Sequence, residues 1–200
     1  MTKPKIFYIA DLHYGHANII RFDNRSFQTL DEMNAALVAR WNGAVSPEDT
    51  VYVLGDMFCR IETSEAVGVL RTLKGKKVLV RGNHDYNTKD SAFCAEFEQI
   101  ADYLEIEDGR KRVVLCHYPI PCFHHHFHED WCHLYGHVHE TFEWDMTERF
   151  KNIMVQAGHN CEMYNAGAMM PWMNYTPRTL SEIWEGANTF YIRRMGGRSL

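Results

Sequence analysis

The chain has 200 residues, of which 46% are hydrophobic, and a formal net charge of -5. This length and apolar content predict one globular domain spanning residues 1–200. The acidic balance argues against binding to extended nucleic acid, which needs a basic surface. Composition does not determine the oligomeric state.

Cysteine and histidine contents indicate the compartment and the chemistry. The six cysteines form no C-x-x-C pair, and a chain of this length needs no disulfide framework, so we expect reduced thiols and a cytoplasmic location. The first residues contain no apolar stretch long enough for a signal peptide or a membrane span, so no membrane partner is expected. Twelve histidines is a high number, and histidine is the commonest metal ligand.

The first half of the chain predicts alternating strands and helices. Short apolar or β-branched runs predict strands at 5–10, 50–54 and 78–80. Apolar residues at helical spacing predict helices at 31–41, ended by Gly43, at 62–73 and at 92–99.

The second half of the chain is richer in predicted strands. The runs 103–106 and 112–116 flank Asp108-Gly109, which is typical of a hairpin turn. A structured loop is predicted at 119–131 and a short strand at 133–135. The remainder predicts alternating strands and turns, a short helix around 180–184 and a mobile tail at 196–200. This order of elements predicts a mixed α/β sandwich.

Five short polar motifs occur in order, and four of them directly follow a predicted strand. They are Asp11-Leu12-His13, Gly55-Asp56, Gly82-Asn83-His84-Asp85, His117 and Gly136-His137-Val138-His139. Because α/β proteins place ligands at strand ends, these side chains are candidate site residues. Their carboxylate, amide and imidazole donors suit Mn, Fe or Zn better than Ca or Mg.

Two local features predict how these donors converge. In the D-x-H and H-x-H pairs, alternation along an extended segment would point both side chains of each pair the same way. Glycine before Asp56, Asn83 and His137 lets the backbone turn sharply and approach bound ions closely. The sequence therefore predicts extended ligand segments next to glycine turns.

The ordered motifs resemble the signature of the calcineurin-like metallophosphoesterase superfamily over residues 11–139. Any one motif is weak, since Gly-Asp or Gly-Asn-His-Asp is often only a turn, but all five in order are a strong signal. The segments 11–27, 32–34 and 41–42, and Asn165-x-Gly167 before Pro177, resemble a compact bacterial and phage branch. The resemblance implies a four-layer αββα fold in which helices flank a β-sandwich.

The resemblance also implies two divalent transition-metal ions, with manganese favoured and iron, zinc or nickel as alternatives. It assigns the first ion to Asp11, His13, Asp56 and His139. It assigns the second ion to Asp56, Asn83, His117 and His137. Asp56 would bridge both ions, whose net positive charge would attract a phosphate and stabilise a bridging hydroxide.

Further residues are expected to act on the substrate. By the resemblance, His84 would be a general acid or transition-state stabiliser, and Asp85 would orient its neighbourhood. Asn83 would also contact the substrate. His16, Arg21 and Arg25 follow the first motif, and arginine favours bidentate phosphate contact, although a surface charge is the alternative for each arginine.

A histidine-rich loop lies between two of the ligand motifs. It contains His124, His125, His126 and His128. We expect this loop to shape the substrate pocket without binding the catalytic ions. The alternative is a solvated loop that aromatic residues anchor.

The sequence therefore predicts a metal-dependent phosphoesterase that acts on a small phosphoester, with diesters favoured over monoesters. A diester's alkoxide leaving group benefits from a proton donor such as His84, and no Lys/Arg cluster surrounds the motifs to hold the more highly charged monoester. Two alternatives are a phosphomonoesterase or nuclease of the same superfamily, and a non-catalytic binding scaffold. The intact His84 and ligand set favour the enzyme.

Overall fold

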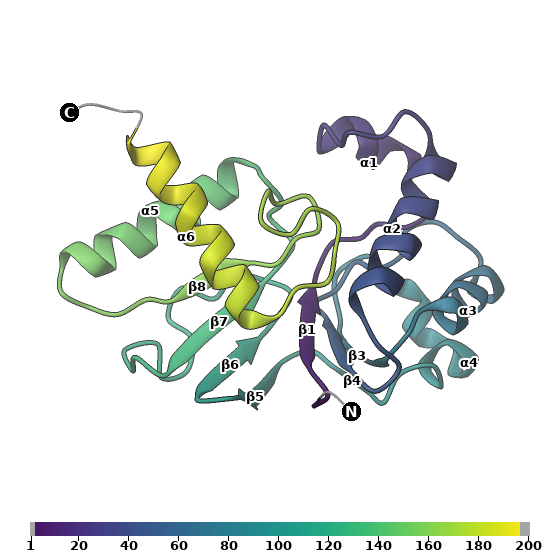
Figure 1. The fold of residues 1–200 in the computed structure, drawn as a ribbon, viewed down its shortest axis with the longest axis horizontal. Coiled ribbons are helices and arrows are strands. Elements are labelled where there is room, and N and C mark those ends of the chain that lie inside the picture. The colour runs from purple at the N-terminus through teal and green to yellow at the C-terminus, as the bar shows by residue number, and fades with distance from the viewer. Residues whose placement is uncertain (1–2, 197–200) are drawn as a thin grey trace.

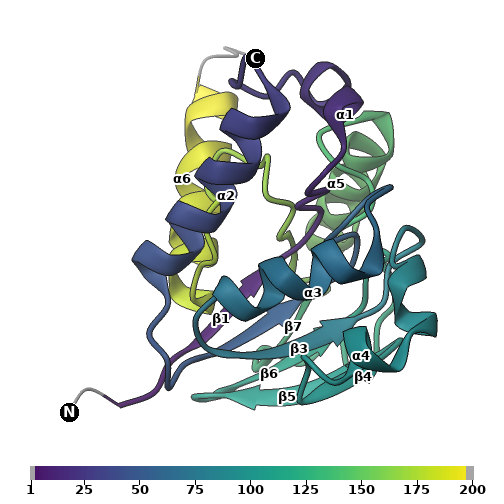
Figure 2. The ribbon, with the colours of Figure 1, turned by 90° about the vertical axis from the view of Figure 1, so that its right-hand side faces the viewer.

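A computed structural model describes residues 3–196, which form two four-stranded sheets flanked by helices (Figure 1). Figure 2 shows the layers from the side, with α3 in front of the first sheet and α5 behind the second. The expected α/β class, a β-sandwich between helices, is confirmed. Most of the tail expected to be mobile, residues 197–200, lies outside the described residues.

The first sheet is entirely parallel. Its order is β1 (Ile6–Ile9), β2 (Thr50–Val53), β3 (Lys76–Val80) and β4 (Gln99–Ala101). The first three strands confirm the predictions from their apolar runs. Because the strands are parallel, their carboxyl ends meet at one edge of the sheet.

The second sheet combines a hairpin with parallel strands. Its order is β5 (Leu104–Asp108), β6 (Lys111–Leu115), β7 (Trp131–Tyr135) and β8 (Met163–Asn165). The first two strands are antiparallel, with Gly109 in the turn at φ +65°, as the hairpin signal predicted. The last three run parallel to one another, so their carboxyl ends also share one edge.

The helices cover the sheets and connect their strands. They are α1 (Ala17–Phe22), α2 (Leu30–Ala44), α3 (Thr63–Thr72), α4 (Ser91–Cys94), α5 (Phe142–Gln156) and α6 (Leu180–Gly196), with a 3₁₀ turn at Tyr86–Lys89. Thr29 caps α2, because its Oγ1 accepts a hydrogen bond from the Glu32 backbone N–H at 3.1 Å. Among the described residues, no helix is both long and apolar enough to cross a membrane.

Several predicted boundaries were wrong. The segment after the last ligand motif contains the helix α5 instead of strands and turns, and α6 is much longer than predicted. α5 fully buries only Trp144 and Thr147, so most of its positions are free to be polar and few apolar residues mark it in the sequence. α4 ends at Cys94 because the chain enters β4 at Gln99, and α2 continues past Gly43 to Ala44. The short helix α1 was not predicted.

One cluster of buried apolar side chains joins both sheets and the helices around them. Val53 of β2 and Leu115 of β6 are fully buried in this cluster. Trp41 of α2 and Trp144 of α5 are almost fully buried in it. Such close packing leaves little freedom to the strand ends. The cluster therefore holds the carboxyl edges of both sheets, and the loops that follow them, in fixed positions.

Candidate metal centre

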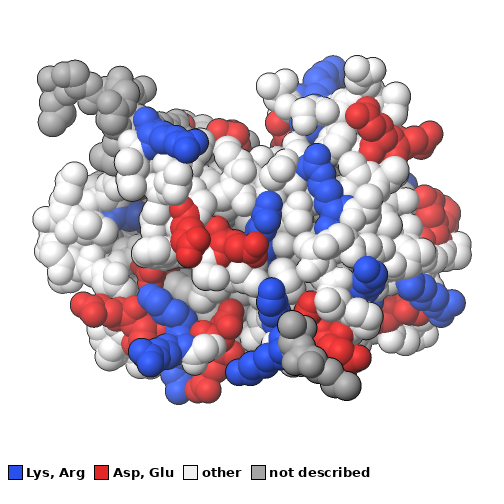
Figure 3. Space-filling model, in the orientation of Figure 1, with Lys and Arg blue, Asp and Glu red and all other residues white. Residues whose placement is uncertain are grey.

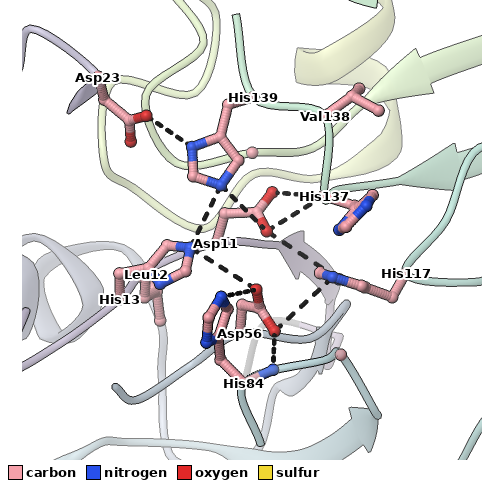
Figure 4. Close-up of polar contacts among 12 residues, drawn as sticks. Asp11, Leu12, His13, Asp23, Asp56, His84, His117, His137, Val138 and His139 are labelled. Atoms are coloured by element: carbon pink, nitrogen blue, oxygen red, sulfur yellow. Dashed lines mark hydrogen bonds and ion pairs between the residues drawn. The ribbon is translucent and has the colours of Figure 1, made fainter. Parts of the chain in front are cut away.

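The five motifs meet where the carboxyl edges of the two sheets come together. Backbone hydrogen bonds join the loops after β1 and β2: Asp11 N–H donates to Gly55 O at 3.0 Å, and His13 N–H donates to Asp56 O at 2.9 Å. Figure 4 shows side chains from five loops pointing into a common space. The fold thus brings residues more than a hundred positions apart in the sequence into contact.

The first group of donors surrounds the ring of His13. His13 Nε2 lies 3.2 Å from His139 Nε2 and 3.7 Å from Asp56 Oδ2. His139 Nε2 also lies 3.9 Å from Asp11 Oδ1. Donors that bind one ion at about 2.1 Å are roughly 3–3.5 Å apart, so these atoms need only small shifts to share an ion.

The second group lies on the other side of Asp56. Asn83 Oδ1 lies 3.1 Å from His117 Nε2 and 3.0 Å from His137 Nδ1. The second carboxylate oxygen of Asp56, Oδ1, lies 3.7 Å from His117 Nε2. Asp56 thus presents one oxygen to each group. Ligand atoms of Asp11, Asp56 and His117 also lie within 4.8 Å of one another, so both carboxylates sit between the groups.

The proton positions of His117 show that its group suits a cation. His117 Nδ1 lies 2.8 Å from the carbonyl oxygen of Leu54, which can only accept, so Nδ1 carries the proton. Nε2 therefore points a lone pair at Asn83 Oδ1, which is itself an acceptor. His117 is fully buried, although Asn83 is exposed, and two acceptors that face each other at this distance repel unless a cation lies between them.

His139 shows the same arrangement in the first group. Its Nδ1 lies 2.6 Å from Asp23 Oδ1, so the proton sits on Nδ1 and the Nε2 lone pair faces the ring of His13. His13 is almost fully buried, and its Nδ1 has no hydrogen-bond partner among the described residues. Both groups of donors thus fit divalent cations.

Burial controls the protonation of the centre. Asp11 is fully buried, and this burial raises its pKa to about 7. Burial lowers the pKa of His13 and of His117, which keeps both imidazoles neutral. Neutral imidazoles are ready to ligate, and a bound cation would favour the ionised form of the buried carboxylate.

The alternation argument predicted that the ligand residues lie on extended backbone, and this prediction was wrong. The φ angles of Asp11, His13, Asp56, His137 and His139 are 53°, 50°, 54°, 69° and 47°. This left-handed region is strained for most residues, although Asp and His tolerate it better than others. The side chains converge because the backbone turns at each ligand, and the hydrogen bonds between loops hold these turns.

Glycines permit the loops to approach one another. Gly55 has φ +84°, and a Cβ there would lie 2.7 Å from the Cα of Gly82. A Cβ on Gly136 would lie 2.6 Å from Asp11 Oδ2. The predicted close approach is therefore present, but it is made to neighbouring loops and to a ligand side chain.

His84 and Asp85 occupy different sides of the centre. The backbone N–H of His84 donates to Asp56 Oδ1 at 2.8 Å, while its partly exposed ring places Nε2 3.9 Å from Asp56 Oδ2. Asp85 is buried, and its carboxylate accepts from the N–H groups of Gly82, Asp56 and Met57 at 2.7, 2.9 and 3.1 Å. Asp85 thus holds three backbone N–H groups of the surrounding loops, whereas the ring of His84 is partly exposed beside Asp56.

The remaining substrate candidates divide in the same way. The ring of His16 lies 5.8 Å from that of His13, beside the first group. Arg21 is exposed on α1, with its guanidinium 5.2 Å from the centre of the Phe22 ring. Arg25 is buried and donates to Asp23 and to the carbonyl oxygen of Asp11 at 2.9 Å. Arg25 is thus neither a surface charge nor a phosphate contact.

We expected the histidine-rich loop to shape the substrate pocket, but its histidines contact residues of the second sheet away from the ligands. His124 Nδ1 lies 2.9 Å from Glu105 Oε1 on β5, and the ring of His125 lies 4.7 Å from that of Trp131, the first residue of β7. Since β6 and β7 are parallel, the connection leaves the site and returns to the amino end of β7. Only its first residues stay at the centre: the ring of Tyr118 lies 4.6 Å from that of His137.

Sequence reasoning missed Asp23 and Asn165 as residues that hold His139. Asp23 accepts from the ring of His139, and Asn165 Nδ2 donates to the His139 backbone O at 3.0 Å. Groups that hydrogen-bond to a metal-binding histidine in this way hold its ring in a fixed orientation. The only sequence signal was that both lie in segments resembling the compact bacterial and phage branch.

Comparisons with known proteins agree with this geometry. The sequence pattern of the calcineurin-like phosphoesterases matches residues 4–163, which include all five ligand motifs. An uncharacterized protein of Methanocaldococcus jannaschii is 43% identical over 86 residues, 42% of this chain and 49% of that protein. The gene 66 protein of Mycobacterium phage L5 is 28% identical over 129 residues, 56% of this chain and 62% of that protein. The chain thus spans about half to three fifths of the length of these relatives.

A solved structure matches over nearly the whole fold. The crystal structure of a protein of unknown function from Aquifex aeolicus aligns with a TM-score of 0.69 and 26% sequence identity. The alignment covers 92% of this chain and 99% of that chain. The arrangement of the two sheets and their helices is therefore shared with a protein of similar extent.

Proposed function

The chain belongs to the calcineurin-like phosphoesterase family, and on this premise we propose that it hydrolyses small phosphodiesters with two divalent transition-metal ions, of which manganese is favoured. The observation that carries the proposal is the pair of donor groups on either side of Asp56. Each group brings imidazole nitrogens together with carboxylate or amide oxygens, which is a donor set that transition-metal cations prefer.

The roles of the side chains follow from their positions. Asp11, His13, His139 and Asp56 would hold one ion, and Asp56, Asn83, His117 and His137 would hold the other. When bound, the ions would supply an activated water and neutralise charge on the phosphoryl oxygens. His84, whose Nε2 lies 3.9 Å from Asp56 Oδ2, would protonate the leaving oxygen.

Charge near the centre supports a diester substrate. The buried guanidinium of Arg25 is directed at the protein's own Asp23 and backbone oxygens, so it offers nothing to a phosphate. Arg21 on α1 is exposed, and its guanidinium lies over the Phe22 ring. A monoester carries about one more negative charge than a diester and needs less help from an acid such as His84.

We also propose that the substrate is a small molecule and that the protein is cytoplasmic. The acidic net charge of -5 supports a small substrate over extended nucleic acid. All six cysteines are free thiols, which supports the cytoplasmic location predicted above.

The test is a comparison of two substrates on the Mn²⁺-loaded protein. We expect a higher kcat/KM for methyl p-nitrophenyl phosphate, a diester, than for p-nitrophenyl phosphate, a monoester. An Asp56→Asn variant purified in parallel should lose both activities, which excludes a contaminating enzyme. A monoester preference would contradict the diester assignment, and no hydrolysis of either ester by fully metal-loaded protein would favour the binding scaffold.

A further inference from the structure

Three exposed aromatic side chains lie next to histidines at or beside the metal centre. Phe22, Tyr86 and Tyr118 are 63%, 67% and 44% exposed. Scattered exposed aromatics are ordinary, but each of these contacts a histidine of the centre or beside it. They come from α1, from the loop after β3 and from the loop after β6, three segments that only the fold brings together.

The ring contacts place these aromatics on separate sides of the ligands. Phe22 meets His16 at 6.2 Å, and Tyr86 meets His84 at 6.3 Å, measured between ring centres. Tyr118 meets His137 at 4.6 Å, on the side of the second donor group. A phosphate held between the donor groups would therefore have an aromatic ring near each of its two ester substituents.

The orientation of these contacts leaves ring faces available. The planes of the paired rings are inclined by 72° at Phe22, 87° at Tyr86 and 67° at Tyr118, so the histidines do not stack flat on the aromatics. An exposed aromatic face gains free energy when another flat ring covers it. The guanidinium of Arg21 over the Phe22 ring adds a cation that can contact a neighbouring phosphate.

We infer that the centre acts on phosphodiesters whose ester groups carry nucleobases, and that Phe22, Tyr86 and Tyr118 stack on these bases. The inference rests on the proposed phosphodiesterase function and names its substrate class. Stacking on aromatic side chains recognises bases in single strands, because paired bases in a duplex cannot reach a side chain in this way. The substrate class is therefore a short single-stranded oligonucleotide, down to a dinucleotide.

Surface charge agrees with a short ligand. On the face shown in Figure 3, Lys and Arg are interspersed with Asp and Glu, and they form no continuous band. Extended nucleic acid needs several phosphate contacts along its length, whereas a dinucleotide has one diester, which the centre itself would hold. Binding strength must then come largely from the bases.

The experiment compares a thymidine dinucleotide with the same compound lacking one or both bases. Binding is measured with non-hydrolysable methylenephosphonate analogues, and kcat/KM with the natural diesters, all with Mn²⁺. We expect removal of a base to weaken binding and to lower kcat/KM about 10-fold. Tyr118→Ala, Tyr86→Ala or Phe22→Ala should weaken binding of the base-bearing compound by a similar factor, whereas Tyr118→Phe and Tyr86→Phe should not.

A matched control comes from the histidine-rich loop. Phe127 is 58% exposed and its ring contacts His125, as the site aromatics contact histidines, but it lies outside the centre. Phe127→Ala should leave binding and kcat/KM unchanged. Equal binding and hydrolysis of base-bearing and abasic compounds would overturn the inference. Base-dependent binding without hydrolysis of any diester, including methyl p-nitrophenyl phosphate, would support the stacking of bases on these aromatics and reject the proposed hydrolysis.

Discussion

Asp23 Oδ1 lies 2.6 Å from His139 Nδ1, and this contact joins the segment after α1 to the last ligand motif (Figure 4). The other carboxylate oxygen of Asp23 accepts from Nε and Nη2 of Arg25 at 2.9 and 2.8 Å. Burial lowers the pKa of His139, but the hydrogen bond to Asp23 and the negative charges of Asp11 and Asp23 together outweigh burial and raise the pKa. The contact keeps the proton on Nδ1 and the Nε2 lone pair toward the first donor group.

Asp23→Asn should weaken the first metal site. The substitution keeps the shape of the side chain but removes the charge that orients and polarises His139, so we expect about 10- to 100-fold weaker binding of one ion. Calorimetric titration of Mn²⁺ into metal-free protein measures this without relying on turnover. Asp102→Asn, which removes an exposed carboxylate paired with Arg81, is the matched control and should leave affinity unchanged. Unaltered Mn²⁺ affinity in Asp23→Asn would refute the positioning role.

Asp56→Ala should disturb both metal sites, because its two oxygens face different donor groups. His13→Ala should chiefly weaken metal binding by the first donor group, because His13 contacts His139 and Asp56 Oδ2 in that group. Metal analysis after Mn²⁺ saturation and desalting is the measurement. We expect two ions per chain in the unmodified protein, about one in His13→Ala and fewer than one in Asp56→Ala. Two retained ions in a folded Asp56→Ala protein would contradict the bridging assignment.

His84→Ala should lower turnover by about 10²–10⁴-fold, the usual range for a general acid or base, without loss of metal. The hydrogen bond from His84 to Asp56 Oδ1 is made by the backbone N–H, so it survives the substitution. The kcat for a diester with a poor leaving group measures the change, and metal analysis is run on the same sample. Loss of an ion in this variant would show that His84 is a ligand instead.

Because of His133, the stability of the folded protein should decrease as the pH falls below 6.5. It is fully buried on β7, and burial lowers its pKa to about 4 from an ordinary value near 6.5. Between these values the unfolded chain binds a proton that the folded protein excludes, so stability rises with pH there and is lost as pH falls from 6.5 towards 4. From pH 7 to pH 5 the loss is about 2 kcal/mol.

Urea unfolding of metal-free protein at pH 7 and pH 5 measures this effect. His133→Gln removes the titrating group, so its free energy of unfolding should change less between the two pH values than that of the unmodified protein. His159→Gln, at an exposed position, is the control and should keep the full pH dependence. Identical pH dependence of His133→Gln and the unmodified protein would count against the buried neutral imidazole.

The sequence by itself determined the ligand motifs and most of the strands that carry them. Runs such as that of β2 are short, apolar and followed by a polar motif, and such local patterns are sufficient to predict a strand end with ligands. The Asp108-Gly109 turn likewise predicted its hairpin from two residues. α5 and α6 were not predicted correctly, because each fully buries only a few side chains, such as Trp144 in α5 and Ile183 in α6, and most of their other positions are polar or partly exposed.

Only the tertiary structure decided which residues support the ligands. Asp23 and His139 are 116 positions apart, and no local pattern pairs them. The parallel pairing of β6 and β7 kept Tyr118 at the centre and took the histidine-rich loop away from it, although the sequence places both between the same two motifs. The left-handed turns at Asp11 and His137 are likewise held by hydrogen bonds between loops. Contacts of this kind depend on chain topology, which local propensity does not encode.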